Sequence, residues 1–457
     1  MRVDVRESMP KRRAIRRLRF HPAQVVFGGF AAAALVGTGL LALPIAKAGE
    51  GGATFVEALF TAVSALCVTG HIVVDTPTYW SGFGQVVILV LIQVGGFGVM
   101  TFASFVGLIV IRRLSFTARL NTAAEAHSLG LDDIKSLVLG VVRISLIVEA
   151  VVALVLAIRF ATGYGYAPLE AAWLGVFHGV SSFNNAGFSL FSDSIIGFAS
   201  DPVVSLTICV SVILGGLGFP VILQLLRHVR RPTLWNMNTR LVLTFTAILL
   251  VGGAIYITAL EWDNPDTLGA LDPGARVLTG FFHSVQTRTA GFNSVDVGAM
   301  DGATLLGMDV LMFIGGGPAG TAGGIKITTF GVLLFILLAE VRGDGVVNVL
   351  GKRLSRAVHR QAIAVVLVSV AVVVVATIAI MLISNLDLDR VLFETISAFA
   401  TVGLSTGITA GLPVPAQLIL VVLMFVGRLG PITFATALAL RERTIVYQLP
   451  KERPIIG

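Results

Sequence analysis

Long apolar segments alternate with short ones along the chain. The long ones exceed eighteen residues, enough to cross a bilayer, whereas the short ones are too brief to do so. Long spans are expected at 25–43, 83–111, 138–158, 203–226 and 240–260, with an interrupted one at 305–340 and further spans between 360 and 443. Short helices are expected at 53–66, 171–182 and 276–286. The pattern predicts an all-α, multi-pass membrane protein.

The short segments end at similar glycine-containing stretches, which are CVTGH at 67–71, NNAGF at 184–188, RTAGF at 288–292 and ATVGL at 400–404. A phenylalanine lies ten residues before each glycine, and a second glycine-rich break follows from Gly95, Gly215, Gly315 and Gly427. This recurrence predicts four diverged copies of one unit, helix–pore helix–loop–helix. They give eight spanning helices and four re-entrant loops around one central pore. The alternative is four packing motifs in which glycine only permits close contact.

The predicted organisation places the repeats at 20–114, 137–231, 232–345 and 346–445. A basic N-terminal segment (1–19), a polar linker (115–136) and a C-terminal tail (446–457) flank or join them. Arginine and lysine gather after the units, as in the cluster 342–360, and acidic residues gather inside them. The positive-inside rule then places both termini in the cytoplasm and the glycine loops on the outer side of the cell membrane. Arg159, at an outer helix end, is the main exception and is expected to snorkel.

Composition supports this picture. Charged residues make up 13% and hydrophobic residues 55% of the 457-residue chain, against roughly 25% charged in soluble proteins. The net charge of +7 is explained by the cytoplasmic clusters and does not indicate nucleic acid. The two cysteines lie in apolar segments and indicate no disulfide framework. The spans hold no cluster of histidine, aspartate or cysteine that would indicate an enzyme or a catalytic residue.

The glycine loops suit a cation. Non-helical backbone at membrane depth is tolerated where protein buries it or where it lines a watery cavity. Glycine permits positive φ, which turns neighbouring carbonyls toward a common axis, and a ring of carbonyls can replace the hydration shell of a cation. The preceding helices point their negative ends at the same place.

Two features below the loops are candidate gates. The stretch GGGPAGTAGGIK cannot form a continuous helix. Its candidate gate residues are Gly315, Gly316, Gly317, Pro318, Ala319, Gly320, Thr321, Ala322, Gly323, Gly324 and Lys326. A phosphate-binding loop is disfavoured because the GxxxxGK[ST] spacing is absent, and a kink without a gating role stays open.

Arg428 occupies the position of Gly96, Gly216 and Gly316 in the other units. Because a buried arginine costs about 2.5–3.5 kcal/mol at mid-membrane, it is expected to serve as an electrostatic barrier. The alternative is an ion pair with Glu149. His178 and His283 are interpreted as structural, and His71 is expected either to hydrogen-bond or to titrate at the outer mouth.

These loops, the RTAGFNS stretch, the GLIVIRR helix end and the GRLGPITF segment at 427–434 resemble the Trk/Ktr/HKT superfamily of potassium transporters, in particular the membrane subunit of bacterial Ktr systems. The resemblance implies that the backbone around the four glycines is a potassium selectivity filter. Its residues here are Cys67, Val68, Thr69 and Gly70; Asn184, Asn185, Ala186 and Gly187; Arg288, Thr289, Ala290 and Gly291; and Ala400, Thr401, Val402 and Gly403. Cys67 and His71 depart from the threonine and leucine common in the family.

The expected function is therefore channel-like potassium uptake. A sodium- or proton-coupled secondary carrier is the alternative, although all four units run in the same direction, unlike inverted repeats. The resemblance further implies a homodimer in the lipid membrane, on a ring of cytosolic RCK-type regulatory subunits that bind ATP or ADP. It also makes sodium a candidate activator. No nucleotide site is expected in this chain.

Overall fold

The computed structural model describes residues 22–118 and 131–430. The predicted N-terminal segment 1–19, most of the predicted linker, the end of the GRLGPITF segment, the end of the fourth repeat and the C-terminal tail 446–457 lie outside the described residues. Almost all of the regular structure in the described ranges is helical, as the hydrophobic pattern predicts.

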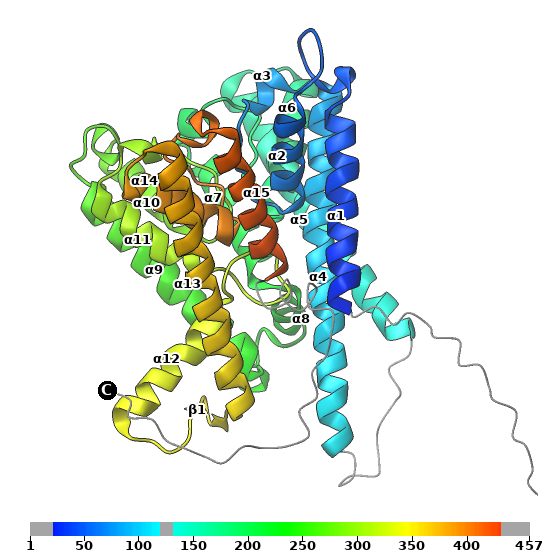
Figure 1. Cartoon of the computed structure of the whole chain (residues 1–457), viewed down its shortest axis with the longest axis vertical. Helices are drawn as coiled ribbons and strands as arrows, with labels where there is room; N and C mark the ends of the chain where they lie inside the picture. The colour runs from blue at the N-terminus through cyan, green and yellow to red at the C-terminus, as the bar shows by residue number, and fades with distance from the viewer. Residues whose placement is uncertain (1–21, 119–130, 431–457) are drawn as a thin grey trace, which may run out of the picture.

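Four long helices, all labelled in Figure 1, each precede a short one. They are α1 (Pro22–Leu41), α5 (Leu131–Tyr164), α9 (Met237–Glu261) and α13 (Arg356–Ser384). Within the described residues, these four are long and apolar enough to cross a membrane, and a bent pair of helices gives a fifth span if it is taken as one. The protein is therefore a multi-pass membrane protein, while the count of eight spans stays a prediction.

A short helix follows each long one: α2 (Phe55–Leu66), α6 (Pro168–Phe183), α10 (Pro273–Gln286) and α14 (Leu388–Ala400). Local sequence explains where they begin. The Thr54 hydroxyl accepts the backbone N–H of Glu57 while the Glu57 carboxylate accepts that of Thr54, so a capping box starts α2. Proline lies in the first turn of α6 and α10, where its missing N–H costs nothing. Most residues in the C-terminal half of each short helix are buried.

The returning helices differ from one another: α4 (Gly82–Ala118), α7 (Pro202–Leu217), α11 (Gly302–Phe313) and α15 (Val414–Leu429). The expectation of one continuous span over 203–226 is wrong. The chain bends by 100° between α7 and α8 (Phe219–His228). Gly218 adopts a φ of +90° there, and Pro220 cannot donate to a continuing helix. The predicted interruption of 305–340 is confirmed, because α11 is followed by a loop and then by α12 (Ile327–Arg342).

The remaining elements are short. One turn of helix, α3 (Thr76–Tyr79), follows the first glycine loop, and strands β1 (Asn348–Val349) and β2 (Lys352–Arg353) form an antiparallel hairpin after α12. In the described residues, 3₁₀ helices lie at Pro44–Ala46, Ile196–Phe198, Pro232–Leu234, Leu268–Ala270, Val297–Ala299 and Thr409–Gly411. Figure 1 shows α3 at one end of the molecule, with α12 and β1 at the opposite end.

The core lies around the short helices. Phe60, Phe177, Phe282 and Phe393 are fully buried at corresponding places in α2, α6, α10 and α14. By contrast, the long helices expose many aliphatic side chains, such as Leu382 at 78% and Leu367 at 65%. Such an outer surface suits contact with lipid chains, which are as apolar as these residues.

Arg159 does not rely on snorkelling alone. Its Nε donates to Asp201 Oδ2 at 2.7 Å, and the Tyr164 hydroxyl donates to the same oxygen at 2.9 Å. The other carboxylate oxygen accepts the backbone N–H groups of Val203 and Val204, so Asp201 also caps α7. One acidic side chain thus fixes the ends of two neighbouring helices.

Candidate functional site

The structure brings the four glycine loops together at the ends of the short helices. We call them loop 1 (Cys67–Gly70), loop 2 (Asn184–Gly187), loop 3 (Arg288–Gly291) and loop 4 (Ala400–Gly403). A Cβ atom on the glycine of each loop would overlap the carbonyl oxygen before the next glycine: Gly70 with Ala186, Gly187 with Ala290, Gly291 with Val402, and Gly403 with Thr69. These contacts lead from loop 1 through loops 2, 3 and 4 and back to loop 1. The four loops therefore form a closed ring in which a side chain larger than hydrogen has no room.

The backbone of the four loops repeats. The glycines have φ values of +87°, +70°, +75° and +95° in loops 1 to 4. Two residues earlier, a non-glycine residue is also left-handed: Val68 (57°), Asn185 (58°), Thr289 (72°) and Thr401 (52°). A left-handed conformation costs an L-residue roughly 1–2 kcal/mol. Four such residues at one position indicate a conformation that the surrounding structure imposes.

The hydrogen-bonded turn that leads into loop 3 is one residue shorter than the turns before the other loops. In loops 1, 2 and 4 the N–H before the glycine donates to the carbonyl of Ser64, Ser181 or Ser397, six residues before that glycine. In loop 3 the Ala290 N–H donates instead to Gln286, five residues before Gly291. The expected match of Phe281 to the other phenylalanines is accordingly wrong, since Phe282 is the fully buried ring.

A cavity of about 380 Å³ opens above the ring. Gly70, Gly187, Gly291 and Gly403 line it, together with the carboxylate-bearing residues Asp75, Asp193 and Asp296. Asp75 also accepts a hydrogen bond from Ser192 Oγ at 2.8 Å, which connects the segments after loops 1 and 2. An acidic vestibule of this kind raises the local concentration of cations. No group of three histidine, cysteine or acidic side chains in the described ranges is arranged to hold a metal.

The histidines of the short helices support the loops. His178 and His283 are fully buried. Their Nε2 atoms accept the backbone N–H groups of Leu190 and Ser294, both at 3.4 Å. Each accepted N–H lies three residues past the last glycine of its own loop, Gly187 or Gly291. This geometry agrees with the structural role predicted for them.

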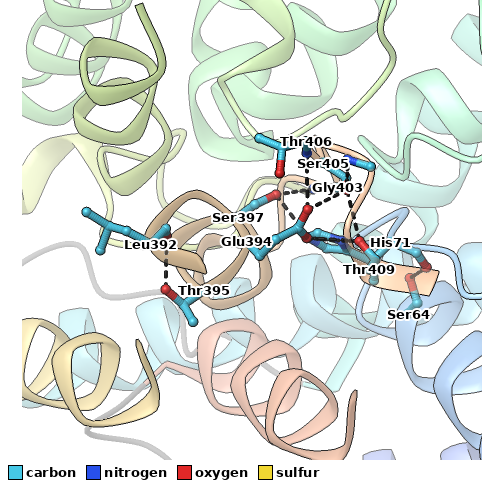
Figure 2. A network of polar contacts seen from close by, with 11 residues as sticks. Ser64, His71, Leu392, Glu394, Thr395, Ser397, Gly403, Ser405, Thr406 and Thr409 are labelled. Carbon is cyan, nitrogen blue, oxygen red and sulfur yellow. Dashed lines mark hydrogen bonds and ion pairs between the residues drawn. The ribbon is translucent and has the colours of Figure 1, made fainter. Parts of the chain in front are cut away.

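Glu394 is a functional-site residue that the sequence analysis missed. It lies in α14 and is fully buried. Figure 2 shows its carboxylate between His71 and the segment that follows loop 4. His71 Nδ1 lies 3.3 Å from Glu394 Oε2, and the Thr409 hydroxyl donates to the same oxygen at 2.9 Å. Glu394 lies nine residues before Gly403, and His178 lies nine residues before Gly187. This matching position is the one feature of the sequence that could have indicated Glu394.

The segment 315–326, which we call the crossing loop, lies directly below the ring. Ile314 and Ile325 pair as a parallel bridge, so the loop leaves α11 and returns beside its starting point. The Gly317 and Thr321 N–H groups donate to the carbonyls of Gly216 and Gly215 at 2.7 and 3.2 Å.

The crossing loop also touches the glycine loops. Thr321 Oγ1 lies 2.8 Å from the side-chain amide of Asn185, and a Cβ on Gly323 would overlap Thr401 Oγ1. The loop therefore fills the space immediately below loops 2 and 4.

Three cationic side chains bind carbonyls of the crossing loop. Arg428, which is 4% exposed, donates to Thr321 and, at 3.0 Å, to Gly95 at the glycine break of α4. Lys326 Nζ donates to Ala322 at 2.6 Å. Arg288 Nη2 donates to Gly315 at 2.9 Å, so its side chain points toward the crossing loop although its backbone belongs to loop 3.

No carboxylate in the described part of the chain pairs with these three cations. The alternative of an Arg428–Glu149 ion pair is wrong. Glu149 instead accepts hydrogen bonds from Gln93 at 3.0 Å and from the Asn184 amide at 3.1 Å. The positive charges beneath the ring are therefore not neutralised by a nearby acid.

Comparison with known proteins is consistent with this geometry. Residues 35–445 match the sequence profile of TrkH, described as a cation transport protein. The chain is 37% identical to the Ktr system potassium uptake protein B of Bacillus subtilis, with 96% of this chain and 97% of that protein covered. It is 32% identical to the potassium/sodium uptake protein NtpJ of Enterococcus hirae, with 96% and 98% covered.

A crystal structure of the potassium transporter TrkH from Vibrio parahaemolyticus has the same fold. The TM-score is 0.73 at 17% identity, with 94% of this chain and 87% of that chain covered.

Proposed function

Because this chain belongs to the TrkH family of cation transport proteins, we propose that it takes up potassium through a channel-like pore in the cell membrane. Its family is one of transporters and not of enzymes. In the proposal, four repeats of helix, pore helix, loop and helix, with eight spans in all, surround the pore, and loops 1 to 4 form its selectivity filter.

The closed ring of glycines is the observation that carries this proposal. Four stretches far apart in sequence share two left-handed positions and lie edge to edge at the ends of buried helices. Carbonyls of such loops can replace the hydration shell of a bare cation. The acidic cavity above the ring supplies cations, and the negative ends of α2, α6, α10 and α14 favour them.

In the same proposal the crossing loop and Arg428 close the pore. The loop fills the space under the ring, and three cations hold it in place. A cation leaving the filter would meet both a steric block and a positive field. Conduction therefore requires the crossing loop to move and Arg428 to release the carbonyls of Thr321 and Gly95.

A gate also requires a controller. We include in the proposal a homodimer and a cytosolic RCK-type regulatory subunit that binds ATP or ADP, with both termini of this chain in the cytoplasm. The names of the Ktr system relatives support a system with more than one component. The basic stretch around the β hairpin offers a cytoplasmic surface for such a subunit. The name of NtpJ, which includes sodium, makes sodium the ion to test as activator or competitor.

Rubidium uptake into proteoliposomes, with potassium or sodium as competitor, tests the function. Gly70→Ser is the informative variant, because a serine Cβ would overlap the carbonyl oxygen of Ala186 and displace loop 2. Potassium-selective uptake that loses selectivity in Gly70→Ser is the expected result. Selective uptake unchanged by the substitution would contradict the filter, and uptake that requires a sodium or proton gradient would favour the secondary carrier.

A further inference from the structure

Three of the four short helices, α6, α10 and α14, carry a hydrogen-bond acceptor at one shared position behind the ring. In repeats 2, 3 and 4 this side chain accepts the backbone N–H three residues past the filter glycine. The acceptors are His178 for Leu190, His283 for Ser294 and Glu394 for Thr406, with the last bond at 3.1 Å. The Glu394 carboxylate in repeat 4 thus occupies the place that the imidazoles of His178 and His283 occupy in repeats 2 and 3.

Glu394 does more than the two histidines. Its Oε1 also accepts the Ser405 hydroxyl, and its Oε2 accepts the Thr409 hydroxyl. The remaining contact of Oε2 is with His71 Nδ1, which belongs to the first repeat. A fully buried carboxylate is costly unless hydrogen bonds satisfy it, and these four donors do so.

His71 is equally unusual in its own position. It directly follows Gly70, where the other loops have Phe188, Phe292 and Leu404, all buried apolar residues. Its side chain is 1% exposed and reaches from repeat 1 to repeat 4. The polar residue after loop 1 and the carboxylate behind loop 4 therefore complement each other.

The contacts continue to the ring itself. His71 Nε2 lies 3.0 Å from Ser397 Oγ, and that oxygen accepts the Gly403 N–H at 3.1 Å. A neutral His71 with its proton on Nδ1 satisfies every partner, because it donates to Glu394 and accepts from Ser397 (Figure 2). The chain of bonds runs from the Glu394 carboxylate through His71 and Ser397 to the filter glycine of loop 4.

We propose that Glu394 is a positioning residue for ion selectivity, which through His71 and Ser397 fixes the separation of loops 1 and 4. The inference rests on the proposed function, since it assigns a role within the same ring. The junction between loops 1 and 4 is where the ring closes, with a Cβ on Gly403 overlapping the Thr69 carbonyl oxygen. A small change in this separation alters the fit of a bare cation more than it alters folding.

The test measures how much sodium and how much potassium halve rubidium uptake into proteoliposomes, for the full chain and its variants. In Glu394→Gln the amide cannot hold the His71 Nδ1–H as a carboxylate does. In His71→Leu the apolar residue found after loop 4 replaces the bridging ring. The selectivity ratio is the sodium concentration that halves rubidium uptake divided by the potassium concentration that does so. Each variant is expected to lower this sodium-to-potassium ratio about tenfold, the effect of one lost hydrogen bond to a charged group.

The double variant distinguishes a linked pair from two separate effects. If Glu394 acts through His71, the combined substitutions lower the ratio no further than the stronger single one. Glu170→Gln, an exposed carboxylate at the start of α6, is the matched control and keeps the wild-type ratio. Should Glu394→Gln fail to fold, His71→Leu and Ser397→Ala carry the same test.

Two results would overturn the inference: folded variants that keep the wild-type ratio while uptake slows, or additive losses in the double variant. Its failure is distinguishable from failure of the proposed function. If Gly70→Ser changes the ratio but Glu394→Gln and His71→Leu do not, the positioning role alone is wrong. If the wild type shows no potassium selectivity, the filter itself is wrong.

Discussion

Gly187 lies so close to the carbonyl oxygen of Ala290 that a Cβ atom on Gly187 would overlap it. The neighbouring atoms are backbone of the next loop and cannot rotate away as a flexible side chain could. The glycines of the other three loops lie equally close to a carbonyl oxygen of the next loop. The dimensions of the ring therefore depend on glycine, which has no side chain, at all four positions.

Gly187→Ala is expected to reduce rubidium uptake by at least about tenfold, equivalent to about 1.4 kcal/mol, because loop 3 must move to accommodate the methyl group. Uptake per folded protein in proteoliposomes measures it. Gly165→Ala is the matched control. Gly165 has a similar φ of +74° but no atom within 4 Å of its added Cβ, so it has the conformational strain without the overlap. Equal losses in both variants would contradict the ring.

Arg428→Gln is expected to increase uptake in the absence of any regulatory partner. The substitution removes the positive charge and weakens the bonds to the Thr321 and Gly95 carbonyls. Since hydrogen bonds to charged groups contribute about 1.5–3 kcal/mol each, the closed state is expected to lose about tenfold or more in population. Basal rubidium flux measures this effect. Arg390→Gln, an exposed arginine in α14, serves as control, and an unchanged flux in Arg428→Gln would argue against a gate.

Arg288→Gln is expected to act in the same direction as Arg428→Gln but more weakly. Arg288 has one bond to the crossing loop, at Gly315, and no partner in the described residues for Nε or Nη1. If both arginines hold one closed state, the double variant has the highest basal flux of the three proteins. A decrease in flux with a changed sodium-to-potassium ratio would instead assign Arg288 to the filter alone.

The Asp201 carboxylate gives a prediction for stability against pH. Burial raises its pKa, but hydrogen bonds from Arg159, Tyr164 and the N–H groups of Val203 and Val204 outweigh this, and the net pKa lies below the ordinary 3.8. The ionised group therefore stabilises the fold above its ordinary pKa. This contribution is lost as the pH falls through the lowered value.

Two substitutions separate the charge from the cap. Asp201→Asn retains an N-cap residue and loses the charge, whereas Asp201→Ala loses both, a further cost of about 1 kcal/mol. In detergent at pH 7 the Tm is expected to fall from wild type to Asn to Ala. As the pH is lowered toward 3.8 and below, wild type and Asp201→Asn converge. A constant difference between them at all pH values would contradict the assignment.

Much of the local structure could be predicted from the sequence because it depends on local chemistry. The short helices, their caps and the glycine loops follow from apolar length, proline and glycine position. The shift in loop 3 could not be predicted, since Phe281 and Phe282 are both plausible until packing decides which ring is buried. The glycine-rich break from Gly215 was recognised, but the 100° bend at Gly218 was not, because the length of the apolar run suggested a single span.

Contacts between residues of different repeats could not be predicted from the sequence either. Glu394 and His71 are far apart in the chain, and nothing in the CVTGH stretch indicates that His71 contacts a residue of α14. Arg428 was expected either to serve as an electrostatic barrier or to form an ion pair with a carboxylate. The second expectation followed because a buried charge is commonly paired with an opposite one. Arg428 donates instead to the carbonyl of Thr321 in the crossing loop and to that of Gly95 in α4, and the tertiary fold is what brings these two carbonyls to it.

The bend between α7 and α8 places the start of α8 against the crossing loop. The Phe219 N–H, at the start of α8, donates to the Ala319 carbonyl at 3.1 Å, and Gly218 lies against Pro318. The crossing loop therefore cannot be displaced without breaking this bond or rotating α8 about Gly218. A displacement of the basic end of α8, at Arg227, is therefore coupled through this ten-residue helix to the segment beneath the ring.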